Sequence, residues 1–141
     1  MALFANGKMI DSNLVFSEAQ LIDNATGGLD STNTVHFVGC RNGKLQVNVV
    51  AATDISIANG QSFTIAIQYG TTASPTTSLY DVLYTRTGSG SAVTHSAGDK
   101  IAQYMIPADR AAAYDYAKLV YTTSADEGNT EKVDAFINII T

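Results

Sequence analysis

The feature that most constrains the fold is a pair of β-rich runs near the end of the sequence, at residues 116–123 and 132–140. In the second run every other residue from Val133 to Ile139 is apolar, which is the two-residue period of a strand with one buried face. The first run carries apolar side chains on both faces, as is typical of a strand inside a sheet. The acidic, glycine-containing segment between the runs indicates a hairpin. The apolar face of the second run requires cover from another sheet.

Short strands separated by turn residues recur along the rest of the sequence. The clearest alternation lies at residues 63–69. Further strands are expected at residues 16–22, 34–38, 45–52, 55–57, 79–86, 92–95 and 100–106. The Asn42-Gly43 pair predicts a type I′ hairpin turn before the strand at 45–52. Residues 109–114 favour a short helix, with Asp109 capping its first turn.

About eight or nine short strands with frequent turns predict an all-β fold, an antiparallel β-sandwich or jelly roll. A chain of 141 residues suits one such domain. We place this domain at residues 15–141. Residues 1–14 show no clear period and are expected to form an irregular N-terminal arm.

Composition excludes several classes of partner. The net charge is −5 and no Lys/Arg cluster is present, which argues against binding to nucleic acid. The start lacks the apolar segment of a signal peptide, and no apolar run is long enough to span a membrane. The single cysteine, Cys40, cannot form an internal disulfide, which is compatible with a reducing cytoplasm. We expect a soluble protein made in the cytoplasm, with no nucleic acid and no membrane as partner.

No arrangement of residues predicts catalysis. His36 and His95 are the only histidines, and neither has a second histidine, a cysteine or a carboxylate at metal-ligand spacing. A nucleophilic Cys40 would need one of these histidines to approach it in space, and no local signature supports this. A buried structural thiol is the simpler interpretation. We therefore expect no enzyme activity, no catalytic residue, no metal ligand and no cofactor.

The acidic segment from Asp126 to Glu131 leaves two interpretations open. Its oxygen atoms suit weak Ca²⁺ binding, although the order of residues in an EF-hand is absent. A solvated turn at the tip of the expected hairpin is the alternative.

The aromatic residues point to a surface that another molecule covers. Tyr80, Val82 and Tyr84 alternate along one expected strand, so they would share a face. Tyrosine combines an apolar ring with a polar tip and suits surfaces buried against a partner. Ordinary packing at the rim of the core is the alternative. If the face is exposed, self-association is the simplest way to cover it, and we favour a homodimer over a trimer.

Several segments carry a resemblance to a known family. Near the start, LVFSEAQLI at residues 14–22 precedes STNTV at residues 31–35. Near the end, Pro107 and Tyr114 precede YAKLVYT at residues 116–122 and VDAF at residues 133–136. Together and in this order, these segments resemble the capsid cement, or decoration, proteins of tailed bacteriophages. They are most similar to the Bordetella-phage type of podophage cement protein.

The resemblance implies a role as a structural protein of the virion. In that family a jelly roll docks on the outside of the icosahedral capsid and bridges neighbouring major capsid protein subunits, usually as a small homo-oligomer. Such a protein is made in the cytoplasm of the host bacterium and ends up on the outer capsid surface. It would stabilise the shell against the pressure of packed DNA through multivalent attachment.

We expect the contacts with the capsid, or with a second copy, to come from apolar residues of the arm, of the start of the strand that follows it and of the strand at 79–86. The residues expected there are Phe4, Met9, Ile10, Leu14, Phe16, Tyr80 and Tyr84. A carbohydrate- or receptor-binding β-sandwich of a virion is the alternative function. The absence of tryptophan, a preferred platform for sugars, counts against it. An enzyme is the weakest of the three classes.

Overall fold

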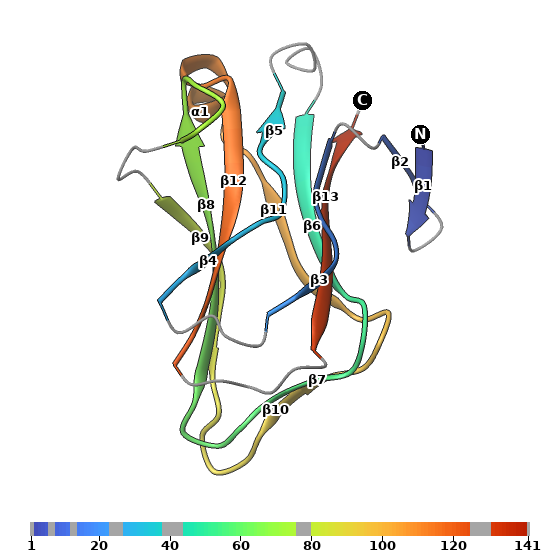
Figure 1. Ribbon diagram of the computed structural model, residues 1–141, viewed down its shortest axis with the longest axis vertical. Helices are drawn as coiled ribbons and strands as arrows, with labels where there is room; N and C mark the ends of the chain where they lie inside the picture. Colours follow the sequence, from blue (N-terminus) through green and yellow to red (C-terminus); the bar gives the residue numbers. More distant parts are fainter. Residues whose placement is uncertain are drawn as a thin grey trace.

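The computed structural model describes residues 2–5, 8–11, 14–22, 27–37, 44–75, 80–124 and 131–140, with side chains from Leu14 onward. Two antiparallel sheets pack face to face (Figure 1). The four-stranded sheet has the order β11 (Lys100–Met105), β6 (Lys44–Ala51), β13 (Lys132–Ile140), β3 (Val15–Leu21). The five-stranded sheet has the order β4 (Leu29–Asp30), β12 (Tyr116–Thr123), β8 (Ser62–Gly70), β9 (Tyr80–Thr87), and β5 (Val35–His36) also pairs with β12.

Three smaller elements complete the described part of the chain. β1 (Ala2–Ala5) and β2 (Lys8–Asp11) form a hairpin on the outer side of the four-stranded sheet (Figure 1). β7 (Ile55–Ile57) and β10 (Val93–His95) form a two-stranded ribbon at one end of the sandwich. The helix α1 (Ala108–Ala113) lies at the opposite end.

The strand order is that of a jelly roll. With β4 and β5 counted as one interrupted strand, the two sheets are built from eight principal strands of the described chain. When these eight strands are numbered along the chain, the four-stranded sheet has the order 6-3-8-1 and the other sheet has the order 2-7-4-5. Every link between successive principal strands therefore crosses from one sheet to the other, except the link between β8 and β9. The prediction of an all-β, antiparallel jelly roll is confirmed.

The core lies between the two sheets, where the two-residue period of each strand directs apolar side chains inward. Val133, Ala135 and Ile137 of β13 are buried, as the alternation predicted. They face the buried side chains of β8 and β12 across the sandwich. Full burial of one such large apolar side chain contributes about 1.5–3 kcal/mol to the free energy of unfolding. The largest fully buried side chains of this core are Tyr69, Tyr121, Phe16, Phe37 and Phe63.

The two predicted hairpins are wrong. β12 pairs with β4, β5 and β8, whereas β13 pairs with β3 and β6 in the other sheet. Likewise β5 and β6, which flank the Asn42-Gly43 pair, belong to different sheets. In both cases the strands on either side of the polar segment lie in different layers of the sandwich. A turn dipeptide shows that the chain reverses, but the distribution of apolar faces decides which strand becomes the neighbour.

The predicted arm differs from the structure as well. Residues 2–11 contain the β1–β2 hairpin, where an irregular segment was expected. β2 contacts β13 from the outer side of the four-stranded sheet. On that face Val15, Val50 and Phe136 form a small apolar cluster separate from the main core, and each is less than a tenth exposed. The hairpin thus lies as a third layer over an apolar part of the sheet.

The short helix is confirmed with shifted bounds. It begins at Ala108 after Pro107, and Asp109 lies in its first turn. Asp109 is therefore not the N-cap that the sequence suggested. Proline at the N-cap fixes the backbone angle φ without a side-chain hydrogen bond to the first turn.

Candidate functional site

The two histidines considered for catalysis each contact a tyrosine. The ring of His36 stacks on Tyr116 at a centroid distance of 4.3 Å. The His95 Nε2 atom lies 2.8 Å from the hydroxyl of Tyr84. Cys40 lies outside the described residues. Within the described part of the chain, no group of three or more His, Cys, Asp or Glu side chains is placed to hold a metal ion.

Of the acidic segment considered for Ca²⁺, residues 125–130 lie outside the described residues. Glu131 itself is buried, and its Oε1 atom accepts a hydrogen bond of 3.3 Å from the backbone N–H of Ser56. Together with Asp54, Ser56 and His95, Glu131 lines a small polar pocket of about 240 Å³ beside the β7–β10 ribbon. Glu131, the residue before β13, is thus hydrogen-bonded to β7 of the ribbon.

The residues expected at an interface do not lie together. Leu14 and Phe16 belong to the core of this chain, with 4% and 0% of their surface exposed. They are therefore not available to a partner, which corrects the prediction for both. Phe4 lies on β1, and Met9 and Ile10 lie on β2, with Phe4 opposite Met9 in the hairpin.

Tyr80 and Tyr84 are separated by a β-bulge. Ile65 of β8 pairs with Tyr84, but the next residue, Ala66, pairs with Val82, so Leu83 is an extra residue in β9. Tyr80 and Val82 therefore face outward and are 47% and 58% exposed. Tyr84 points inward, where its ring packs edge-on against Phe63 at 5.7 Å. The shared face expected for the three residues is reduced to Tyr80 and Val82.

A polar cluster inside the sandwich was not recognised in the sequence. Asp81 of β9 accepts a hydrogen bond of 3.3 Å from the Arg110 Nε atom of α1. Tyr69 of β8 and Tyr104 of β11 lie beside the same carboxylate. The Tyr69 hydroxyl is buried and meets the geometry of a hydrogen bond with no described residue. The guanidinium carbon of Arg110 lies 5.9 Å from the centre of the Tyr69 ring, and the ring of Tyr114 stacks on that of Tyr69 at a centroid distance of 5.6 Å.

The ionisation of this cluster follows from its surroundings. Burial acts to raise the pKa of Asp81, but the neighbouring Tyr69, Arg110 and Tyr104 side chains outweigh it and lower the pKa below its ordinary value. Burial raises the pKa of Tyr69 and of Tyr104, and the nearby Asp81 charge adds to this. The cluster therefore holds an ionised carboxylate between two neutral tyrosines and one arginine. It links both sheets to α1.

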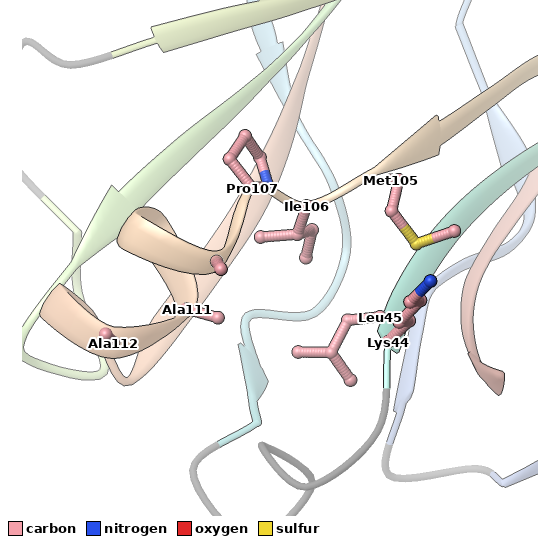
Figure 2. A pocket seen from close by; sticks show the side chains of 8 residues that line it. Lys44, Leu45, Met105, Ile106, Pro107, Ala111 and Ala112 are labelled. Carbon is pink, nitrogen blue, oxygen red and sulfur yellow. The ribbon is translucent and has the colours of Figure 1, made fainter. Parts of the chain in front are cut away.

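Next to this cluster, the sandwich opens into a pocket of about 430 Å³ between α1 and the start of β6 (Figure 2). Leu45 and Ile106 point toward the helix, and Lys44 and Met105 lie on the side of the pocket away from it. The lining residues are Lys44, Leu45, Met105, Ile106, Pro107, Ala108, Ala111 and Ala112. The volume and the mainly apolar lining are those of a small ligand site.

Sequence reasoning missed this pocket. The alternation of β6 indicated that Leu45 faces inward, but no sequence pattern shows that the opposite wall is built from alanines. The one available signal is the run of three alanines after Arg110, since small side chains leave space where a helix meets a sheet.

The described part of the chain contains no helix long and apolar enough to cross a membrane. The sequence matches no protein-family model and no curated protein.

Proposed function

We propose that this protein is a structural virion protein that binds the outer surface of an icosahedral phage capsid, where it bridges and stabilises major capsid protein subunits. The resemblance of its sequence segments to phage cement proteins supports this proposal. The jelly-roll strand order is the architecture that the resemblance implies. The partners would be the major capsid protein and a second copy of the chain.

The observation that carries the proposal is the presence of two separate apolar surfaces on one small domain. The first is formed by Tyr80 and Val82 on the outer face of the five-stranded sheet. The second is one end of the four-stranded sheet, where Met105 of β11 and Ile139 and Ile140 of β13 are 40%, 44% and 37% exposed. Ile139 and Ile140 are consecutive, so they present apolar surface on both faces of this end. The three residues lie close together because Met105 pairs with Gln46 of β6, and Ile139 and Ile140 pair with the two residues before it.

Two apolar surfaces on different sheets suit a protein that contacts two neighbours at once. Single exposed apolar side chains are common on soluble proteins, but grouped ones mark interaction surfaces. A bridge between subunits needs at least two such contacts, because the second contact forms at high effective concentration once the first is made. We assign the surface around Met105 to the capsid and the surface around Tyr80 to a second copy.

The test uses expanded, cement-free capsids of the phage that encodes this protein. We expect the purified protein to co-sediment with them saturably and to raise their melting temperature. Met105→Glu should weaken binding about tenfold or more, because it places a charge in the apolar surface. Gln103→Glu adds the same charge to the same strand and should bind like the wild type.

Absence of saturable binding by the well-folded wild type would refute the capsid assignment. Glycan binding by the same preparation would then favour a receptor- or sugar-binding module. Equal loss of binding in Met105→Glu and Gln103→Glu would show that the contact depends on net charge and would remove the assignment of this surface.

A further inference from the structure

Apart from Met105, which also belongs to the surface assigned to the capsid, the pocket beside α1 is built from residues that the proposed function does not use. It lies where the two sheets separate, between a helix of six residues and the first residues of β6. Leu45 and Ile106 are core residues that form its inner wall. The helix contributes Ala108, Ala111 and Ala112, whose small side chains leave the space open (Figure 2).

The electrostatic character of the pocket is set by one cation. Lys44 is the charged residue of its lining, and it is exposed at the rim. Among the described residues, no carboxylate lies within ion-pair distance of the Lys44 nitrogen. The nearest charged pair on the helix, Asp109 and Arg110, does not line the pocket, and Arg110 is engaged by Asp81. Within the described residues, the pocket therefore offers an apolar interior and, at its mouth, a positive charge with which no described carboxylate pairs.

We propose that this pocket binds an aliphatic group that carries a carboxylate. Transfer of an alkyl chain from water to the apolar wall lowers the free energy of the bound state. The ammonium of Lys44 favours an anionic group at the end of the chain near the rim. In the virion, the group would be an aliphatic side chain next to an aspartate or glutamate of the major capsid protein. That source rests on the proposed function, whereas the chemical class of the ligand rests on the pocket alone.

The first experiment measures binding of octanoate to the isolated protein by calorimetry and by NMR. Octylammonium, which has the same alkyl chain and the opposite charge, serves as the matched probe. We expect saturable octanoate binding with chemical-shift changes at Leu45, Ile106 and Ala111, and about fivefold weaker binding of octylammonium. Absence of saturable octanoate binding, or shift changes elsewhere on the protein, would overturn the proposal.

Variants test the wall and the charge separately. Ala112→Phe should fill the pocket and abolish binding of both probes, whereas Ala113→Phe, at an exposed alanine of the same helix outside the lining, should leave binding unchanged. Lys44→Glu should reverse the preference toward octylammonium, and Lys100→Glu, on an exposed lysine of β11, should not. The proposal is contradicted if Ala112→Phe and Ala113→Phe bind the probes equally well. It is also contradicted if Lys44→Glu and Lys100→Glu show the same preference between the probes.

These measurements are independent of the capsid. If octanoate binds as described but the wild type does not bind capsids, the capsid assignment fails and the pocket stands. If capsids bind but octanoate does not, the ligand inference fails and the proposed function stands. If both hold, Ala112→Phe should weaken capsid binding relative to Ala113→Phe.

Discussion

At the scale of single residues, the Asp81 cluster shows how a polar group becomes part of a β-sandwich core. The Asp81 side chain is 20% exposed and that of Arg110 is 30% exposed, so water only partly screens their interaction. The cluster joins β8 and β9 of one sheet to β11 of the other and to α1. Since a carboxylate placed there without partners would destabilise the fold, each neighbour of Asp81 has a structural role.

We predict that Asp81→Asn lowers the free energy of unfolding at neutral pH by about 1–2 kcal/mol, because the charge-assisted hydrogen bond from Arg110 is lost. The pKa of Asp81 is lower in the folded protein than in the unfolded chain. Its stabilising contribution is therefore present above the ordinary pKa of aspartate and is lost as the pH falls through the lowered value.

The measurement for this prediction is urea unfolding from about pH 7 to pH 2.5. The wild type should lose more stability than Asp81→Asn as the pH falls below about 4. Asp109→Asn is the control, because Asp109 is 77% exposed and lies 3.9 Å from the same arginine. It should change stability little. Parallel curves for the wild type and Asp81→Asn would contradict the assigned role.

At the scale of elements, β9 shows the limit of reading faces from alternation. The sequence predicts its existence and approximate ends, since aromatic and β-branched residues alternate from Tyr80 onward. The bulge at Leu83 then moves Tyr84 to the inner face. A one-residue insertion inverts every later position of a strand. No local residue marks this bulge, because it is fixed by pairing with β8.

We predict that Tyr80→Ala weakens self-association, whereas a change at Tyr84 acts on folding. Tyr80 projects from the exposed face of β9, so its removal takes away contact area without disturbing the core. Sedimentation velocity should show a dimer for the wild type and at least a tenfold higher dissociation constant for Tyr80→Ala.

Tyr84→Ala removes a ring that packs on Phe63 and a hydroxyl that bonds His95. Because Tyr84 is only partly buried, the loss in free energy of unfolding should be about 2 kcal/mol. A wild type that sediments as a monomer at all accessible concentrations would remove the basis for assigning Tyr80 to self-association.

The strand list and the connections between strands differ in how far the sequence determines them. The runs at 116–123 and 132–140 coincide with β12 and β13, because alternation is a local property of each strand. The expected hairpin between them fails, because pairing depends on which sheet each buried face covers. The pocket escaped notice for the same reason: Leu45 and Ala111 are far apart in the sequence and become opposite walls only when the sheets close.

At the scale of the whole molecule, the N-terminal hairpin is the element least integrated into the sandwich. Its two strands pair with each other, and β2 reaches β13 only from outside the sheet. The ladders of both large sheets contain no residue of the hairpin in the described chain. An added layer of this kind can act at an interface without being required for the strand order beneath it.

We predict that deletion of residues 1–12 abolishes capsid binding and leaves the jelly roll folded. The expected loss of binding follows from the apolar residues that the hairpin carries: Phe4, Met9 and Ile10. Retention of the fold follows because Leu14 and Phe16, the first core residues, remain. Near-native β-sheet circular dichroism and a cooperative melt should accompany the loss of co-sedimentation with capsids.

The deletion also uncovers the outer cluster of Val15, Val50 and Phe136, so a shortened protein that merely aggregates must be distinguished from one that cannot bind. A companion variant, Phe136→Gln in the shortened chain, reduces that apolar surface. If this soluble, folded variant still binds capsids as the full-length protein does, the hairpin is not the capsid contact. The surface formed by Met105, Ile139 and Ile140 would then carry the attachment alone, because it is the remaining exposed apolar group on that sheet in the described chain.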